Sequence, residues 1–173
     1  MRKTLATLIC CAALASAQGP RRAPGFALPD IQMLTGHGGK FHDLADYRGK
    51  VVVLEFFKTT CPHCSAFADV LAQVAPKYGD KVAVLAVASL TTDTPVQVEQ
   101  YRAGHKISYP VLLDQGQMMF SYVQSPNQID LPRVYIVDPG GYIHDDFIYG
   151  LTTRDIFEGK GLFPELDKIL GKK

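Results

Sequence analysis

The 173-residue sequence has no strong excess of either charge and no apolar run long enough to cross a membrane. Its 18 Lys and Arg residues nearly balance its 17 Asp and Glu residues, so it lacks the basic stripe that grips phosphates or lipid headgroups. The apolar run from Leu5 to Leu14 is well short of the roughly 20 residues of a membrane-spanning helix. With 47% hydrophobic residues, the composition is that of one globular domain.

The first 17 residues have the pattern of a secretory signal peptide. Arg2 and Lys3 precede the apolar run, and the small-residue stretch 15–17 follows it. We therefore expect residues 1–17 to be a signal peptide and residues 18–173 to form one exported domain, in the periplasm if the cell is bacterial. Whether the leader is cleaved or kept as an anchor stays open at this stage.

Cysteines are scarce in the exported segment, because Cys10 and Cys11 lie in the leader and only Cys61 and Cys64 remain. A bridge across CxxC closes so short a loop that it removes little entropy from the unfolded chain, which disfavours a structural role. Zinc normally takes four ligands, and the sequence has no second CxxC and no paired-histidine spacing. We expect no metal, and a soft-metal carrier is the non-enzymatic alternative.

Strand and helix patterns alternate through the rest of the chain. The apolar runs 51–57 and 82–89 are typical of strands that are buried on both faces. Helical spacing begins after Cys61, where Pro62 suits a first turn, and Pro76 is expected to bend or end this helix. The further expected elements are a helix within 94–105 capped by Thr94, a strand at 111–113, a helix at 118–123, a hairpin of 133–138 with 142–150, and a helix at 156–170.

This element order, with CxxC at the start of the first core helix, resembles the thioredoxin fold. The resemblance implies an α/β domain whose central mixed β-sheet is flanked by helices, with an N-terminal extension and a short βα insert. The stretches APGFALPD, GKVVVLEFF, YPVLLD and LPRVYIVDPGGYI are similar to blocks of the secreted TlpA/ResA-type proteins of the AhpC/TSA superfamily, over roughly residues 23–170. We therefore expect a protein thiol-disulfide oxidoreductase, monomeric and without a dissociable cofactor. Its transient partners would be protein thiols or disulfides and an unidentified redox partner.

The active-site motif departs from that family and resembles another. TlpA/ResA-type proteins usually have a tryptophan before the first cysteine, whereas this sequence has no tryptophan and has Thr60 there. The stretch CPHC resembles the disulfide oxidant DsbA instead. The chain between Gly79 and Pro132 is too short for the helical domain that DsbA inserts.

Disulfide exchange requires a thiolate, and a helix N-terminus stabilises one through its unpaired N–H groups and its dipole. We expect Cys61 to be the nucleophile at the tip of the helix and Cys64, one turn further on, to be the resolving thiol. Pro62 completes the redox motif, and His63 is expected to add a donor or a positive charge that stabilises the thiolate further. The alternative for His63 is a solvated side chain.

Glu55 and Pro132 complete the candidate catalytic residues. Glu55 interrupts an apolar strand, where an unpaired charge is costly and a raised pKa is expected. By the thioredoxin resemblance it accepts the proton of Cys64; the alternative is an acid that reaches water or has a structural partner. By the same resemblance the Leu131–Pro132 bond is cis and both residues contact substrate; the alternative is a trans proline that opens an edge strand.

The direction of electron flow is the main alternative left open. The active site favours oxidation or isomerisation of substrates, whereas a TlpA/ResA-like body favours their reduction, for example in cytochrome c maturation. A thiol peroxidase with antioxidant activity is disfavoured, because the threonine expected three residues before its reactive cysteine is replaced by Lys58 before Cys61.

Overall fold

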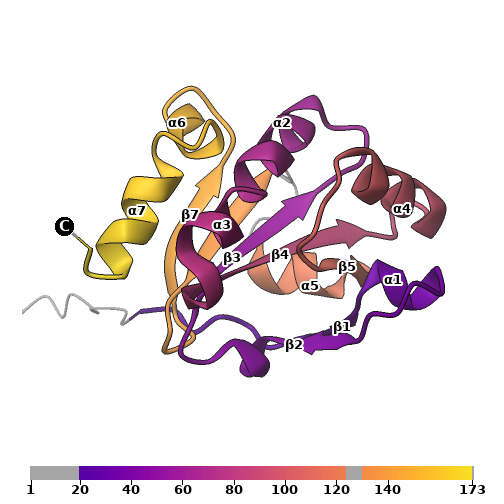
Figure 1. Cartoon of the computed structure of the whole chain (residues 1–173), viewed down its shortest axis with the longest axis horizontal. Helices are drawn as coiled ribbons and strands as arrows, with labels where there is room; N and C mark the ends of the chain where they lie inside the picture. The colour runs from indigo at the N-terminus through magenta and orange to yellow at the C-terminus, as the bar shows by residue number, and fades with distance from the viewer. Residues whose placement is uncertain (1–19, 124–129, 173) are drawn as a thin grey trace, which may run out of the picture.

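The central sheet has five strands in the order β5-β4-β3-β6-β7 (Figure 1). The computed structural model describes residues 20–123 and 130–172. The strands are β3 (Val51–Phe57), β4 (Val82–Ser89), β5 (Val111–Asp114), β6 (Arg133–Val137) and β7 (Ile143–Ile148). Strands β3, β4 and β5 are parallel, and β6 and β7 are antiparallel to their neighbours. The mixed sheet expected from the sequence is confirmed.

Helices cover both faces of this sheet. Aliphatic and aromatic side chains on one face of the sheet pack beneath α2 (Pro62–Leu71), α3 (Val74–Tyr78), α4 (Pro95–Gly104), α6 (Arg154–Phe157) and α7 (Leu162–Ile169). The opposite face packs against α5 (Gln117–Tyr122) and part of the N-terminal segment. Because β3 and β4 are buried on both sides, their sequences are continuously apolar apart from Glu55 and Ser89.

The N-terminal extension forms a small antiparallel pair, β1 (Ala27–Pro29) with β2 (Phe41–Asp43), which lies beside the main sheet. Between and after these strands lie α1 (Ile31–Leu34) and the 3-10 turn η1 (Leu44–Tyr47). The expected signal peptide and its two cysteines lie outside the described residues. None of the helices in the described ranges has the length and apolar content needed to cross a lipid bilayer.

Two expected helices are divided in the structure. The helix expected at 156–170 is wrong as one element: α6 and α7 are separated by a turn that contains Gly159 at φ 82° and Gly161. Glycine adopts positive φ without the steric cost that other residues incur, so Gly159 allows the turn after α6, and Gly161 is the N-cap of α7. The bend expected from Pro76 is confirmed, because α2 ends at Leu71 and Pro76 lies in the first turn of the separate helix α3.

The capping box of α4 gives a test of the local sequence signals. The Thr94 side chain accepts a hydrogen bond from the Gln97 backbone N–H, and the Gln97 side chain accepts one from Thr94 N at 2.8 Å. We predict that Thr94→Ala lowers the free energy of unfolding by about 1 kcal/mol, because an N–H group at the helix start loses its partner. Denaturant unfolding measures this change. Thr152→Ala, at an exposed threonine beside α6, is the control, and an equal loss in both variants would contradict the prediction.

Candidate active site

Cys61 and Cys64 lie at the N-terminus of α2, and both thiols are free. Cys61 is the N-cap residue and is partly exposed, whereas Cys64 is fully buried. The backbone N–H of Cys64 donates a hydrogen bond to Cys61 Sγ over 3.2 Å. A thiolate at Cys61 would accept this bond and face the positive end of the helix dipole, which supports the expected nucleophile.

Pro62 and His63 form the exposed first turn of α2. Pro62 occupies the position where its missing N–H leaves no helix hydrogen bond unmade. The imidazole of His63 stacks on the ring of Tyr149, with centroids 3.9 Å apart and planes at 17°. His63 is therefore an exposed residue whose ring rests on Tyr149, and its effect on the thiolate stays a prediction.

Tyr149 is a site residue that the sequence analysis missed. It follows β7, far from CPHC in the chain, and its backbone N–H donates to Pro132 O over 3.1 Å. Its ring also contacts Phe157 edge-on at 5.5 Å between centroids, and Phe157 contacts Phe67 of α2. Only the fold brings this aromatic column beside the motif, so no local sequence signal could identify it.

The Leu131–Pro132 peptide bond is cis and lies beside the first cysteine. Cys61 Sγ donates to Leu131 O over 3.7 Å, so the loop before β6 borders the nucleophile. The cis bond expected from the family resemblance is confirmed. The substrate contacts expected of Leu131 and Pro132 stay a prediction.

Glu55 is buried in β3, 1% exposed, on the sheet face that packs against Cys64. Its Oε1 atom has no hydrogen-bond partner among the described residues. Burial raises the pKa of Glu55 to about 8. Burial, and then the charge of Glu55, raise the pKa of Cys64. The expected raised pKa of Glu55 is confirmed, and its proton-transfer role stays a prediction.

A second buried carboxyl supports the loop that precedes Cys61. Asp93, 3% exposed, accepts hydrogen bonds from the backbone N–H of Thr59 at 3.3 Å and from the Thr59 and Thr92 hydroxyls. These hydrogen bonds connect Thr59, which follows β3, to Asp93 in the loop after β4. Asp93 also escaped the sequence analysis, because an acid just before a helix N-cap is usually solvated.

Metal ligands do not gather at the cysteines within the described ranges. In the described ranges, one group of three side chains is close enough together to hold an ion: His144 and Asp145 of β7 with Glu165 of α7. Its members are partly exposed or exposed, and Lys168 already pairs with Glu165 at 3.1 Å. The soft-metal alternative therefore finds no third ligand beside Cys61 and Cys64 in this part of the chain.

Comparison with known proteins places this site in a family. Residues 21–145 match the AhpC/TSA family. The chain belongs to the AhpC/TSA family. This AhpC/TSA chain is 29% identical over 133 residues to the thioredoxin-like protein YneN of Bacillus subtilis (strain 168), over 76% of the chain and 75% of the relative. It is also 29% identical over 140 residues to the thiol-disulfide oxidoreductase ResA of Bacillus thuringiensis (strain Al Hakam), over 80% of the chain and 74% of ResA.

Solved structures confirm the thioredoxin-like fold of this AhpC/TSA member. The exposed lipoprotein thioredoxin Etrx1 of Streptococcus pneumoniae strain TIGR4 superposes with a TM-score of 0.66, over 84% of this chain and 99% of Etrx1, at 23% identity. The expected TlpA/ResA-like family and enzyme class, a thiol-disulfide oxidoreductase, are confirmed by the names of these relatives.

The buried carboxyl predicts an unusual dependence of stability on pH. The Glu55 carboxyl has a pKa of about 8 in the folded protein, against 4.5 for an unperturbed group. Between these two pKa values Glu55 is ionised in the unfolded chain but still protonated in the folded protein. The free energy of unfolding therefore falls as pH rises: the contribution of protonated Glu55 is complete below pH 4.5 and is lost as pH approaches 8. Glu55→Gln removes this titration while it preserves side-chain volume.

We predict that the wild type loses about 2–4 kcal/mol of unfolding free energy relative to Glu55→Gln between pH 5 and pH 8, since one pKa unit corresponds to about 1.4 kcal/mol. Denaturant unfolding in reducing buffer at both pH values measures the difference. Asp80→Asn, at an exposed carboxyl, serves as the control. Parallel pH profiles for the wild type and Glu55→Gln would contradict a buried Glu55 with a raised pKa.

Proposed function

We propose that this protein is an exported thiol-disulfide oxidoreductase that oxidises or isomerises protein thiols through its Cys61–Cys64 pair. The observation that carries the proposal is the asymmetry of the two thiols. Cys61 is accessible and accepts an N–H bond at a helix start, whereas Cys64 is buried beside a carboxyl of raised pKa. Cys61 is therefore suited to form the mixed disulfide with a partner protein, and Cys64 is suited to exchange with Cys61 inside the protein.

In the oxidising direction, a substrate thiolate attacks Cys61 Sγ of the Cys61–Cys64 disulfide. The bond between the cysteines breaks, Cys64 leaves with the electron pair, and the protonated Glu55 carboxyl supplies its proton. A second substrate thiolate then attacks the substrate sulfur of the mixed disulfide, and Cys61 leaves as a thiolate at the helix start. The substrate is oxidised by two electrons and the cysteine pair is reduced.

His63 supports oxidation as the preferred direction. A donor or a positive charge beside Cys61 stabilises the thiolate of the reduced form and has no comparable effect on the disulfide, so the disulfide becomes a stronger oxidant. The stack on Tyr149 holds His63 at this end of the helix.

Reduction of substrate disulfides is the second candidate function. The relatives named thiol-disulfide oxidoreductase ResA favour it, because the body of this chain matches theirs over 80% of its length. The same residues serve this direction: Cys61 attacks the substrate, and Glu55 takes the proton of Cys64 as Cys64 attacks Cys61. A thiol peroxidase is supported by AhpC/TSA membership alone, and Lys58 stands where that chemistry expects a threonine.

The role of His63 predicts a change in redox equilibrium. We predict that His63→Ala shifts the equilibrium with glutathione at least about tenfold toward the disulfide form, which corresponds to about 30 mV in potential. Tyr149→Leu shifts it in the same direction by a smaller factor, whereas Tyr149→Phe keeps the stack and stays close to the wild type. Equilibration in glutathione buffers, with thiolate absorbance recorded in parallel, measures all three. An unchanged equilibrium in His63→Ala would remove the support for the oxidant direction.

The assignment of the two thiols predicts which variant retains its partners. Cys64→Ser should hold substrate proteins as mixed disulfides on Cys61, because the internal thiol that would release them is absent. Non-reducing gels followed by mass spectrometry of an exported-protein extract measure the trapped species. Cys61→Ser is the matched control and should trap none; equal trapping by both variants would overturn the assignment.

A further inference from the structure

Three buried polar atoms on one face of the sheet have no hydrogen-bond partner among the described residues. They are Glu55 Oε1, Tyr101 Oη and Tyr109 Oη. An unpartnered polar group in a protein interior costs stability, so native proteins rarely keep several together without a use. All three residues border the core that contains Cys64, and neither tyrosine has a part in the mechanism above.

The sheet register brings Tyr109 close to the row of Glu55. Glu55 pairs with Ala86, and Ala86 pairs with Val111, so the three residues lie side by side across β3, β4 and β5. Tyr109 lies two residues before Val111 and belongs to the same core cluster. Because Ala86, Val111 and Tyr109 all belong to the core cluster that contains Cys64, Tyr109 lies in the layer that holds the carboxyl.

Tyr101 of α4 occupies the space nearer the cysteines. Its ring stacks on Phe57 with centroids 4.9 Å apart, and Phe57 lies two residues after Glu55 on the same face of β3. The ring also contacts the partly exposed His105, at 4.5 Å between centroids, and the Ser65 side chain of α2 lies near its hydroxyl. Burial, followed by the charges of Glu55 and Cys64, raises the pKa of Tyr101, which agrees with this position.

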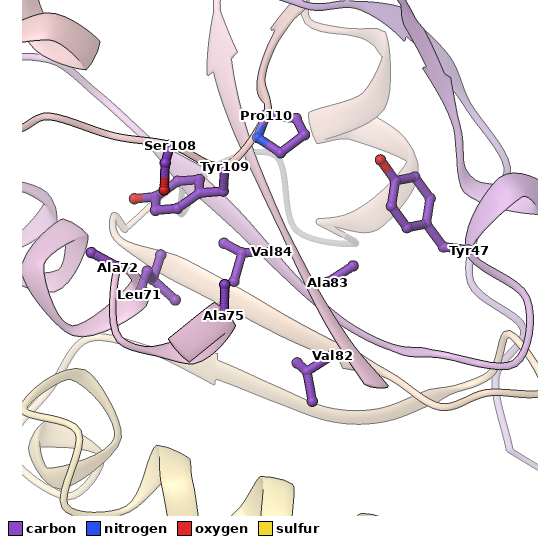
Figure 2. A pocket seen from close by; sticks show the side chains of 10 residues that line it. All are labelled: Tyr47, Leu71, Ala72, Ala75, Val82, Ala83, Val84, Ser108, Tyr109 and Pro110. Carbon is purple, nitrogen blue, oxygen red and sulfur yellow. The ribbon is translucent and has the colours of Figure 1, made fainter. Parts of the chain in front are cut away.

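Tyr109 connects this core to a cavity. The cavity has a volume of about 220 Å³ and lies between α2, the start of β4 and the segment before β5 (Figure 2). Tyr109 and Ser108 form one side of it, and Leu71 and Val84 are among its other lining residues. Apart from Glu55, the titratable groups that act on Tyr109 are Tyr101 and the exposed Asp69.

We propose that Tyr101 and Tyr109, bridged by water, form the path by which a proton passes between Glu55 and the cavity of Figure 2 during disulfide exchange. A hydroxyl both accepts and donates, so each tyrosine can take a proton on one side and release its own on the other. Both are positioning residues, because neither touches the reacting sulfurs. The proposal rests on the proposed function, in which Glu55 exchanges a proton with Cys64.

The step that needs this path is the attack of Cys64 on a mixed disulfide at Cys61. Glu55 first loses its own proton, and the resulting carboxylate accepts the proton of Cys64. The Cys64 thiolate then attacks Cys61 Sγ, and the leaving thiolate departs with the electron pair. The carboxyl must then lose that proton before it can act again. Cys64 and Glu55 are both buried, so this proton cannot pass directly to solvent, and the two tyrosine hydroxyls on the same side of the sheet offer it a relay.

The test uses the full exported chain loaded with glutathione as a mixed disulfide on Cys61 at low pH, followed by a jump to neutral pH. Release of glutathione is followed by stopped flow in H₂O and in D₂O. We expect Tyr101→Phe and Tyr109→Phe each to slow release about three- to tenfold, to enlarge the solvent isotope effect and to shift the pH profile of release, because a proton step becomes limiting. The change to phenylalanine keeps the ring packing, so both variants should fold.

Tyr78→Phe is the matched control. Its hydroxyl also belongs to this core but donates to Phe163 O over 3.0 Å and does not adjoin Glu55, so we expect wild-type release. Wild-type release rates in Tyr101→Phe, Tyr109→Phe and the double variant would overturn the path. Equal slowing in Tyr78→Phe would overturn it too, since it would indicate a general packing effect.

Glu55→Gln separates this proposal from the function on which it rests. If Glu55→Gln releases glutathione at the wild-type rate, the proton step of the proposed function fails, and the tyrosine path fails with it. If Glu55→Gln is slow while both phenylalanine variants match the wild type, only the tyrosine path fails. Slow release in all three variants, with little further slowing when they are combined, supports a single proton route.

Discussion

The Glu55 carboxyl and the Cys64 thiol share one buried space, and this proximity governs the chemistry of the site. Burial favours the neutral form of both groups, and the charge of Glu55 further disfavours a thiolate at Cys64. Both groups are therefore neutral more readily than an exposed acid or thiol would be. Because burial alone favours the neutral form of the Glu55 carboxyl, no neighbouring cation is needed to balance its charge.

The surrounding fold separates the buried pair, Glu55 and Cys64, from the accessible pair, Cys61 and His63. Helix α2 begins at Cys61 and places Cys64 one turn deeper, so the same four residues present an accessible sulfur and a hidden sulfur. The cis Leu131–Pro132 segment borders the accessible sulfur, and the Tyr149 ring supports His63 beside it. Asp93 fixes the loop that leads into the helix. One helical turn therefore presents Cys61 toward the surface and Cys64 toward the buried carboxyl.

Local chemistry made much of this predictable from the sequence. The runs 51–57 and 82–89 are strands with those bounds, Thr94 caps its helix, and the odd acid within β3 is buried as its neighbours require. The family resemblance supplied the cis bond at Pro132. The partners that depend on distant segments were not predictable: the stack of Tyr149 on His63, the Asp93 anchor and the clustering of Tyr101 and Tyr109 arise only when separate elements pack together. The division of the last helix was missed because helical spacing continues through its glycines.

We propose that a body similar to ResA carries a cysteine pair that oxidises its substrates. The most direct measurement is the reduction potential of the wild-type Cys61–Cys64 pair at neutral pH, by equilibration with reduced and oxidised glutathione. The account predicts a value well above that of thioredoxin, toward the about −120 mV of DsbA. A value near the about −270 mV of thioredoxin would contradict the oxidant account and make the protein a reductase.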